Sequence, residues 1–193
     1  IVLFTKLVNW QNYKFTDTKP VNFKNRNNFI KDIFRGKSPK YSNIDNSIIL
    51  NQKCNRWNEI QLGYAKTVNE SWIKKVNKNT FTKVGDILIN STGEGTIGRA
   101  SLIDKDHEGF LFDSHILLCR VNKDLINPLF LVYQINSRYG QKQIEGLKSA
   151  QATNQTELGV DNFKKIGFIL PAIKKQEQIA IEIDRKSVVK GKN

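Results

Sequence analysis

The stretch Gly85–Arg99 reads GDILINSTGEGTIGR and carries the most informative pattern of the chain. Ile87–Ile89 is an apolar run typical of a strand, and glycines follow it at the spacing of a dinucleotide-binding loop: Gly93, Gly95 and Gly98. A true fingerprint needs a helix that begins at the loop, because the helix N-terminus must face the pyrophosphate. Here the loop continues into the mixed run RASLI and an acidic turn. This continuation predicts the second strand of a hairpin and argues against cofactor binding.

The same stretch, extended to Ala100, resembles the signature segment of target recognition domains in the specificity subunits of type I restriction–modification enzymes. The resemblance continues in order through IILNQKCNRWNEI (48–60), DSHILLCRVN (113–122), INPLFLVYQINSRYGQKQIE (126–145) and ATNQTELGVDNFKKIGFILPAIKKQEQIA (152–180). In the family these segments correspond to a strand with a polar loop, a core strand, an internal helix and the exit into a long conserved helix. The resemblance covers roughly residues 30–180. It implies a protein that reads DNA sequence for partner enzymes.

The composition is strongly basic. Lys and Arg number 31 against 18 acidic residues, which gives a net charge of +13 and a pI near 9.7 over 193 residues. A chain this basic favours a polyanionic partner, and nucleic acid is the commonest one. A solvated basic surface in an organism rich in Lys, Asn and Ile would give the same composition, so charge alone leaves both interpretations open.

No apolar run reaches the about 18 residues of a membrane span, and no signal peptide is visible. We therefore expect no membrane partner, and the resemblance implies the cytoplasm of a bacterium or archaeon. The chain begins at Ile1 and not at a methionine, so we expect a fragment of a longer protein. Cys54 and Cys119 lie far apart and lack metal-ligand spacing, which predicts two reduced thiols.

Local patterns divide the chain into the ranges 1–28, 29–172 and 173–193. With the resemblance, these are expected to be an N-terminal arm or linker, a DNA target recognition domain and the start of a conserved spacer helix. Residues 187–193 break the apolar spacing of that helix, so we expect it to be truncated or non-native there. The predicted fold class is α+β, with a mixed or antiparallel sheet and short helices, followed by the start of the long helix.

The expected elements follow from periodicity and capping signals. The segment 29–42 begins with a helical pattern that Gly36 closes, followed by a basic loop over 37–41. Further helical patterns lie in 69–79 after the cap Asn69, after the cap Asn127 with Pro128 as first residue and a break at Gly140, and from Lys174 onward. Expected strands are Ile48–Leu50, Asp86–Asn90, Arg99–Ile103, His115–Val121 and Phe163–Leu170, and residues 146–159 are expected to form a loop.

Few groups converge for catalysis. Asn127–Phe130 superficially resembles the Asn-Pro-Pro-Tyr/Phe tetrapeptide of amino-methyltransferases, but Leu129 replaces its second proline and helix capping explains the rest. Asp113–His115 are neighbours on a strand, where successive side chains point to opposite faces, so we expect His115 to be structural. Other acidic residues lack a nuclease pattern: Asp86, Glu94, Asp104 and Asp106. We predict no catalytic residue, no metal site and no cofactor in this chain.

The loops are rich in side chains that contact DNA. Phosphates are bound by Lys, Arg and small hydroxyl groups, whereas base edges are read by Arg, Asn, Gln, Ser and Thr. Trp57 follows Arg56 in a polar loop and is a candidate for an exposed contact with DNA. The candidate DNA-binding residues are Lys37, Ser38, Lys40, Tyr41, Asn51, Gln52, Lys53, Asn55, Arg56, Trp57, Ser91, Thr92, Gly93, Gly95, Thr96, Arg99, Ser149, Gln151, Thr153, Asn154 and Gln155.

The resemblance also implies partners. These are double-stranded DNA, the methyltransferase (modification) subunits and the restriction subunit, with S-adenosylmethionine and ATP/Mg used by those subunits. The C-terminal helix would pair with a second recognition domain or with a second copy of the chain. Two alternatives stay open: the C-terminal specificity domain of a fused restriction–methylation enzyme, and a nucleotide-dependent enzyme that uses the 93–98 glycine loop.

Overall fold

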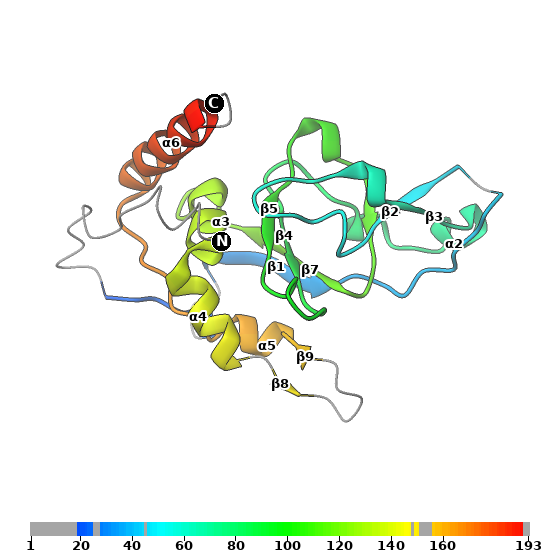
Figure 1. Ribbon diagram of the computed structural model, residues 1–193, viewed down its shortest axis with the longest axis horizontal. Coiled ribbons are helices and arrows are strands. Elements are labelled where there is room, and N and C mark those ends of the chain that lie inside the picture. The colour runs from blue at the N-terminus through cyan, green and yellow to red at the C-terminus, as the bar shows by residue number, and fades with distance from the viewer. Residues whose placement is uncertain (1–18, 25–27, 45, 148, 151–155, 191–193) are drawn as a thin grey trace.

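The computed structural model describes residues 19–24, 28–44, 46–147, 149–150 and 156–190. Its centre is a four-stranded sheet in the order β1-β7-β4-β5, in which every pair of neighbours is antiparallel (Figure 1). The strands are β1 (Ile30–Arg35), β4 (Ile87–Asn90), β5 (Ala100–Leu102) and β7 (Ile116–Val121). We call this the main sheet.

A smaller lobe extends from one side of the main sheet (Figure 1). It holds the sheet β3-β2-β6, in which β2 pairs antiparallel with β3 and parallel with β6. Its elements are β2 (Ile48–Leu50), the 3₁₀ turn η2 (Leu62–Tyr64), β3 (Lys66–Thr67), α2 (Glu70–Ile73), the 3₁₀ turn η3 (Lys78–Thr80) and β6 (Leu111–Phe112). Trp72 packs against the buried cluster of this lobe, as expected of a core residue. The mixed sheets and short helices confirm the predicted α+β class.

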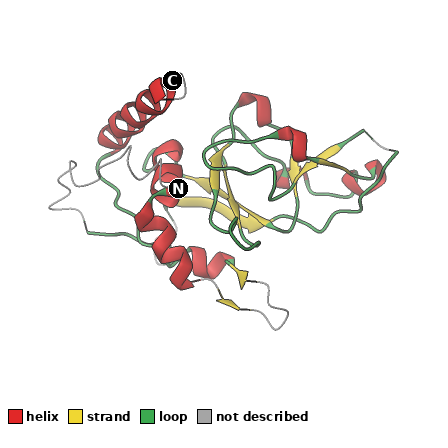
Figure 2. Cartoon of the chain, in the orientation of Figure 1, coloured by secondary structure: helices red, strands yellow, loops and turns green. Residues whose placement is uncertain are grey.

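The helices gather on the opposite side of the main sheet (Figure 2). They are α3 (Pro128–Asn136), α4 (Arg138–Leu147), α5 (Val160–Phe163) and α6 (Ile173–Lys190), and a third 3₁₀ turn, η4 (Lys105–His107), follows β5. The largest buried cluster joins β4 and β7 to α3, α4 and α5, with residues such as Ile87, Leu117, Leu131 and Phe163. Removal of this apolar surface from water is the main contribution to the stability of the domain.

The Gly85–Arg99 stretch folds as the hairpin that the sequence predicts. Ile87 pairs with Leu102 and Ile89 with Ala100, so the glycine loop joins two antiparallel strands and no helix follows it. The glycine loop therefore lacks the following helix that a dinucleotide-binding loop requires. The cap of α3 is confirmed as well, since the Asn127 Oδ1 accepts a hydrogen bond from the Phe130 N–H, 2.9 Å away, with proline at the first helical position.

The helix expected from residue 29 to Gly36 is wrong, because this segment forms β1. The register of β1 against β7 shifts between Ile30 and Asp32, which is a bulge in the strand. A bulge inserts one residue and breaks the alternation of apolar side chains. Ile30, Ile33 and Phe34 therefore lie at a spacing that imitates a helix.

Two further expectations need correction near α4. Gly140 does not break the helix: α3 ends at Asn136, and α4 starts one residue after Ser137, whose Oγ accepts from the Gly140 N–H at 3.1 Å. Gly140 is required because a Cβ there would lie 2.3 Å from the Gln134 carbonyl oxygen. The segment expected to be a loop over 146–159 contains the paired strands β8 (Ser149–Ala150) and β9 (Thr156–Glu157).

The strand expected over Phe163–Leu170 is also wrong. Phe163 ends α5, and Phe168 makes a single antiparallel bridge with Val21 through two backbone hydrogen bonds of 2.8 Å. Phe23 is buried against Phe168, with ring centroids 5.0 Å apart. Residues 21–23 of the expected N-terminal arm are therefore packed into the domain.

The helix expected from Lys174 is α6, which extends to Lys190 and so includes part of the segment thought to break its pattern. Ile179, Ala180 and Ile183 are buried against Phe130 and Tyr133 of α3. The first turn is fixed by the side chain of Gln176, a fully buried residue. Its Oε1 accepts from the Asn127 N–H, and its Nε2 donates to the carbonyl oxygens of Leu125 and Pro171.

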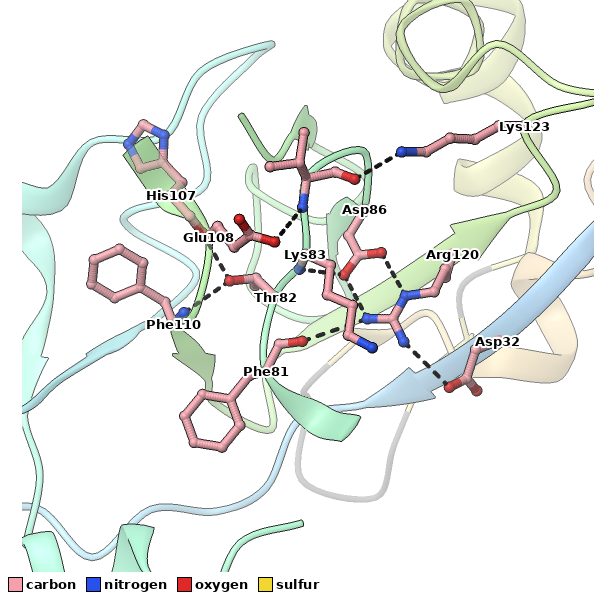
Figure 3. Close-up of polar contacts among 11 residues, drawn as sticks. Asp32, Phe81, Thr82, Lys83, Asp86, His107, Glu108, Phe110, Arg120 and Lys123 are labelled. Atoms are coloured by element: carbon pink, nitrogen blue, oxygen red, sulfur yellow. Dashed lines mark hydrogen bonds and ion pairs between the residues drawn. The ribbon is translucent and has the colours of Figure 1, made fainter. Parts of the chain in front are cut away.

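The end of the main sheet near the start of β4 is closed by charged groups (Figure 3). The Arg120 Nε and Nη2 donate to the two carboxylate oxygens of Asp86 at 2.8 and 2.7 Å, and Asp32 lies 3.9 Å from Nη1. The Asp86 carboxylate also accepts from the Lys83 N–H. Bidentate pairing of this kind fixes both side chains. We call this the closed end of the main sheet.

Both cysteines are buried free thiols, as expected. Cys119 lies on β7, where burial raises its pKa to about 12. Burial also raises the pKa of the Cys54 thiol. Both side chains are therefore protonated and behave as small apolar groups at neutral pH.

Candidate DNA-binding surface

Several loops meet at the opposite end of the main sheet. Because its neighbouring strands are antiparallel, the last residues of β1 and β4 lie beside the first residues of β5 and β7: Arg35 pairs with Leu117, and Asn90 pairs with Ile116. The loops 36–41, 91–99 and 113–115 therefore leave the sheet together. The segment 51–61 and the strand β9 join them through side-chain and backbone contacts described below. We call this the open end.

Loop 51–61 is attached to the β4–β5 hairpin by a buried asparagine. The fully buried Asn55 Nδ2 donates to the Leu88 and Arg99 carbonyl oxygens and to the Asn90 Oδ1, at 3.0–3.2 Å. The Asn90 Nδ2 in turn donates to the Gln52 carbonyl oxygen at 3.0 Å. These amides satisfy backbone groups that would otherwise be buried without partners. Two segments far apart in sequence thus form one rigid base.

A second buried asparagine fixes the other side of the hairpin. Asn136, the last residue of α3, accepts from the Ala100 N–H at 2.9 Å and donates to the Ala100 carbonyl oxygen at 2.7 Å. It also donates to the Asn58 Oδ1 at 2.7 Å. Sequence reasoning placed Asn136 on the helix but not in the site, since no local pattern signals a contact with residues so distant in the chain.

Residues 56–59 form a tight turn next to the hairpin. The Arg56 N–H donates to the Glu59 carbonyl oxygen at 2.9 Å, and Asn58 adopts a left-handed backbone with φ 62°. The Asn58 N–H donates to the Ala100 carbonyl oxygen at 3.0 Å. This turn presents Arg56 and Trp57, both half-buried. The guanidinium of Arg99, from the hairpin loop, lies 5.7 Å from the centre of the Trp57 ring.

Loops 36–41 and 113–115 form the next part of the open end. Lys37 makes a parallel bridge with Asp113, and the Ser38 and Ser114 hydroxyl groups lie 3.4 Å apart. The His115 Nδ1 lies 2.7 Å from the Thr92 Oγ1, which links this loop to the hairpin. Burial raises the pKa of the Asp113 carboxyl, whose Oδ1 accepts from the His115 N–H.

Arg35 holds strand β9 at the open end. The Arg35 guanidinium forms an ion pair with Glu157 of β9 and donates to the Ser91 Oγ at 3.3 Å. Thr92 and Glu157 form an antiparallel bridge, and the Leu158 N–H donates to the Ser91 carbonyl oxygen at 2.7 Å. Strand β9 therefore lies beside the start of the hairpin loop.

The predicted site residues divide by exposure. Exposed at the surface are Lys37, Ser38, Lys40, Tyr41, Lys53 and Gly95; half-buried are Gln52, Arg56, Trp57, Gly93, Thr96 and Arg99; buried are Asn51, Asn55, Ser91 and Thr92. Gln151, Thr153, Asn154 and Gln155 lie outside the described residues, and Ser149 lies at the start of β8.

Three of the predicted contacts need correction in their role. Asn51, Asn55 and Ser91 are at most 5% exposed, and their polar atoms bond to neighbouring loops. A side chain with its polar atoms buried in this way cannot reach a ligand without local unfolding. These residues support the surface and do not form it. Their burial could not be predicted from the sequence, because a polar loop residue has the same local pattern whether it faces solvent or a neighbouring loop.

Other residues of the open end were not among the candidates. Tyr64 and Gln61 contact Arg56, and Lys66 lies 4.7 Å from the ring centre of Tyr41. Arg35 was missed because its segment was expected to be helical, and His115 because its expected role was purely structural. Among the described residues, no group of three or more His, Cys, Asp or Glu side chains is arranged to hold a metal ion.

Within the described part of the chain, no helix is both long and apolar enough to span a lipid bilayer.

The fold is that of the specificity subunits of type I restriction–modification systems. It is similar to the HsdS subunit from Thermoanaerobacter tengcongensis, with a TM-score of 0.59 and 16% identity over 88% of this chain and 37% of that chain. It is also similar to the S subunit of a type I restriction–modification system from M. genitalium, with a TM-score of 0.55 and 14% identity over 86% of this chain and 37% of that one. At these identities the likeness shows the fold.

Sequence comparison identifies the family. The profile of the type I restriction modification DNA specificity domain matches residues 8–185, and the chain belongs to that family. A type I restriction enzyme MjaX specificity subunit from Methanocaldococcus jannaschii is 30% identical over 121 residues, which cover 62% of this chain and 27% of that protein. The chain thus spans about a quarter of this relative and about a third of the similar structures.

Proposed function

We propose that this domain binds a short, defined sequence of double-stranded DNA. In doing so it would direct the methyltransferase and restriction subunits of a type I complex to one half of a bipartite target. The observation that carries the proposal is the convergence of the 36–41, 51–61, 91–99 and 113–115 loops at the open end of the main sheet. Membership of the specificity-domain family supports the same role.

The open end offers the chemistry that DNA reading needs. Exposed Lys37, Lys40 and Lys53 suit backbone phosphates, and half-buried Gln52 and Thr96 are donors and acceptors of the kind that read base edges. Two or three good bidentate contacts, at roughly 1–3 kcal/mol each, would give on the order of thousandfold discrimination between sequences. The buried asparagines hold the loops in place before DNA arrives, which lowers the entropy cost of binding.

We also propose that the domain is not catalytic, and that S-adenosylmethionine and ATP/Mg are bound by partner subunits. The open end places hydrogen-bonding and cationic side chains together, while its one buried carboxyl, Asp113, is occupied by the backbone of its own loop. A bacterial or archaeal cytoplasm, where such complexes would meet DNA, is the compartment proposed for the protein.

The C-terminal helix α6 is the proposed connection to the rest of an assembly. One side packs on α3 through Ile179, Ala180 and Ile183, and the other side leaves Ile181 about half exposed. This free side suits pairing with the helix of a second recognition domain or of a second copy of the chain. Such pairing would set the distance between two half-sites.

The test is selection of bound duplexes from a random-sequence DNA pool by the full chain at moderate salt. The proposal predicts enrichment of one short sequence over successive rounds. Substitution of open-end side chains such as Gln52→Ala should alter that sequence, whereas Gln178→Ala on the exposed side of α6 should not. Binding without any enrichment, or no binding at all, would contradict sequence-specific recognition by this domain.

A further inference from the structure

Two arginines at the open end share an unusual environment. The Arg56 guanidinium carbon lies 4.6 Å from the centre of the Tyr64 ring, and the Arg99 guanidinium carbon lies 5.7 Å from that of Trp57. The Arg56 Nε donates to the Gln61 Oε1 at 3.1 Å, and the Arg99 Nη2 donates to the Gly95 carbonyl oxygen at 2.9 Å. Aromatic rings and neutral oxygens therefore orient both side chains.

Neither arginine forms an ion pair within the described residues, although Gln61, which accepts from Arg56, also donates to the Glu59 carboxylate. Among the described residues, no carboxylate oxygen lies within 4.0 Å of either guanidinium, and the buried Arg99 Nε has no hydrogen-bond acceptor. Burial, and in second place the positive charge of Arg56, lower the pKa of Arg99. The two cations repel each other, so the free protein keeps them together at a cost.

The scaffold leaves these two side chains little freedom to separate. Arg56 and Trp57 belong to the turn that Asn58 closes with a left-handed backbone and a hydrogen bond to the Ala100 carbonyl oxygen. Arg99 directly precedes Ala100, and its own carbonyl oxygen accepts from the buried Asn55 side chain. Movement of the backbone at Arg56 or Arg99 therefore does not relieve the repulsion between the two guanidinium groups. An anion bound to both groups would relieve it.

We propose that Arg56 and Arg99 together bind a backbone phosphate of the DNA duplex, and do not read a base. This deepens the proposed function and rests on it. A phosphate supplies the negative charge that the pair lacks, whereas base edges are neutral. The Nε atoms are withdrawn, one onto Gln61 and one into the protein, and the Arg99 Nη2 donates to Gly95, so the ligand is left with the remaining Nη–H groups. The oxygens of one phosphate can accept from the Nη atoms of two separate guanidinium groups at the same time.

The experiment compares Arg56→Gln, Arg99→Gln and the double variant with the wild-type chain. Binding is measured on a random-sequence duplex pool and on the duplex selected by the wild type, across a series of KCl concentrations. Each single variant should lose affinity by a similar factor on both duplexes. The slope of log K against log salt should become less steep by about 1 for each arginine removed and by about 2 in the double variant.

A matched control removes a charge elsewhere. Lys105 is exposed on the turn after β5, at the closed end of the main sheet, and Lys105→Gln lowers the net charge by the same amount. Its salt slope should equal that of the wild type. Arg56→Lys and Arg99→Lys keep the charge but lose the planar group, so they should keep the slope while losing part of the affinity. Far-UV circular dichroism and thermal midpoints identify any variant that fails to fold, and the lysine variants then carry the test.

The outcomes separate the two proposals. A wild-type chain that enriches a sequence, with glutamine variants that keep its salt slope and lose preference at one base pair, would overturn the phosphate assignment alone. An equal fall of the salt slope in Lys105→Gln and in the arginine variants would also overturn the phosphate assignment, since any surface cation would then contribute as much as Arg56 or Arg99. A wild-type chain that binds neither duplex would overturn the proposed function itself.

Discussion

The two ends of the main sheet each contain an arginine, and their environments are opposite. At the closed end, Arg120 donates two hydrogen bonds to Asp86, and this pairing raises the pKa of Arg120 (Figure 3). At the open end, Arg99 has no carboxylate within 4.0 Å among the described residues, and burial lowers its pKa. The charge of Arg120 is paired within the protein, whereas the charge of Arg99 is left for a ligand, although Arg35 at the same end pairs with Glu157.

The loops of the open end are rigid although the positive charges of Arg56 and Arg99 are not neutralised. The open end is held mainly by neutral amides, above all Asn55, Asn90 and Asn136. An aspartate at these positions would accept hydrogen bonds, but it would also place a negative charge beside Arg56 and Arg99. The asparagines satisfy the buried backbone groups and leave the positive charge available.

The largest effect on stability is expected at the closed end. Asp86→Ala removes both carboxylate acceptors of Arg120 at hydrogen-bond distance and the acceptor of the Lys83 N–H. It leaves the largely buried guanidinium with only the Phe81 carbonyl oxygen and the more distant Asp32. We expect a loss of about 3 kcal/mol in the free energy of unfolding, because breaking a buried pair costs more than the pair contributes. Urea unfolding measures it. The exposed Asp124→Ala is the control, and a loss below that of the control would refute the importance of the pair.

A smaller loss is expected from Asn55→Ala at the open end. This variant removes the amide that joins loop 51–61 to the hairpin, and it leaves buried carbonyl oxygens without a donor. We expect about 2 kcal/mol of destabilisation, together with weaker DNA binding because both loops lose their support. Urea unfolding and DNA titration report the two effects. The exposed Asn43→Ala should change neither, and an Asn55→Ala variant that is destabilised but binds DNA normally would contradict the supporting role.

Two glycines of the hairpin loop give a matched pair. Both have positive φ, 71° at Gly95 and 81° at Gly98, but only a Cβ at Gly98 would meet a neighbour, the Ile144 Cδ1 at 2.9 Å. Gly95→Ala should therefore cost only the left-handed backbone strain of about 1 kcal/mol, and Gly98→Ala somewhat more. Thermal unfolding of the two variants tests this order. Equal losses would mean that α4 does not constrain the hairpin loop.

The smallest expected effect concerns pH. Burial raises the folded-state pKa of Asp113 above its ordinary value of 3.8, so between the two values the folded chain holds more protons than the unfolded chain. Stability therefore falls as pH rises through this window. Asp113→Asn cannot ionise and keeps the Oδ1 acceptor of the His115 N–H. The variant should lose this part of the decline, as measured by urea unfolding across the window, and an unchanged pH profile would exclude the effect.

The sequence was sufficient where the signal is local. The hairpin of Gly85–Arg99 and the cap at Asn127 are defined by neighbouring residues, and both were predicted correctly. The bulge near Ile30 and the bridge between Val21 and Phe168 depend on partners more than eighty residues away. Neither could therefore be predicted from the neighbouring sequence. The resemblance to the specificity domains supplied the family, which composition and periodicity could not.

The candidate site was predictable only in part. Loop composition indicated Arg56, Trp57 and Arg99, and the structure brings these three together. Loop composition could not separate accessible amides from buried ones: Gln52 and Asn55 are amides of the same loop, but Gln52 is half-buried and Asn55 is fully buried. Exposure of a polar loop residue is a property of the fold and not of the local sequence.

The most direct test of the central claim is backbone amide hydrogen exchange of the full chain, with and without a duplex selected from the random pool. We expect the duplex to slow exchange in loops 36–41, 51–61, 91–99 and 113–115 at the open end. Residues 81–86 and 104–109 at the closed end should exchange as in the free protein. Protection confined to the closed end, or equal protection at both ends, would contradict the assignment of the open end as the DNA-binding surface.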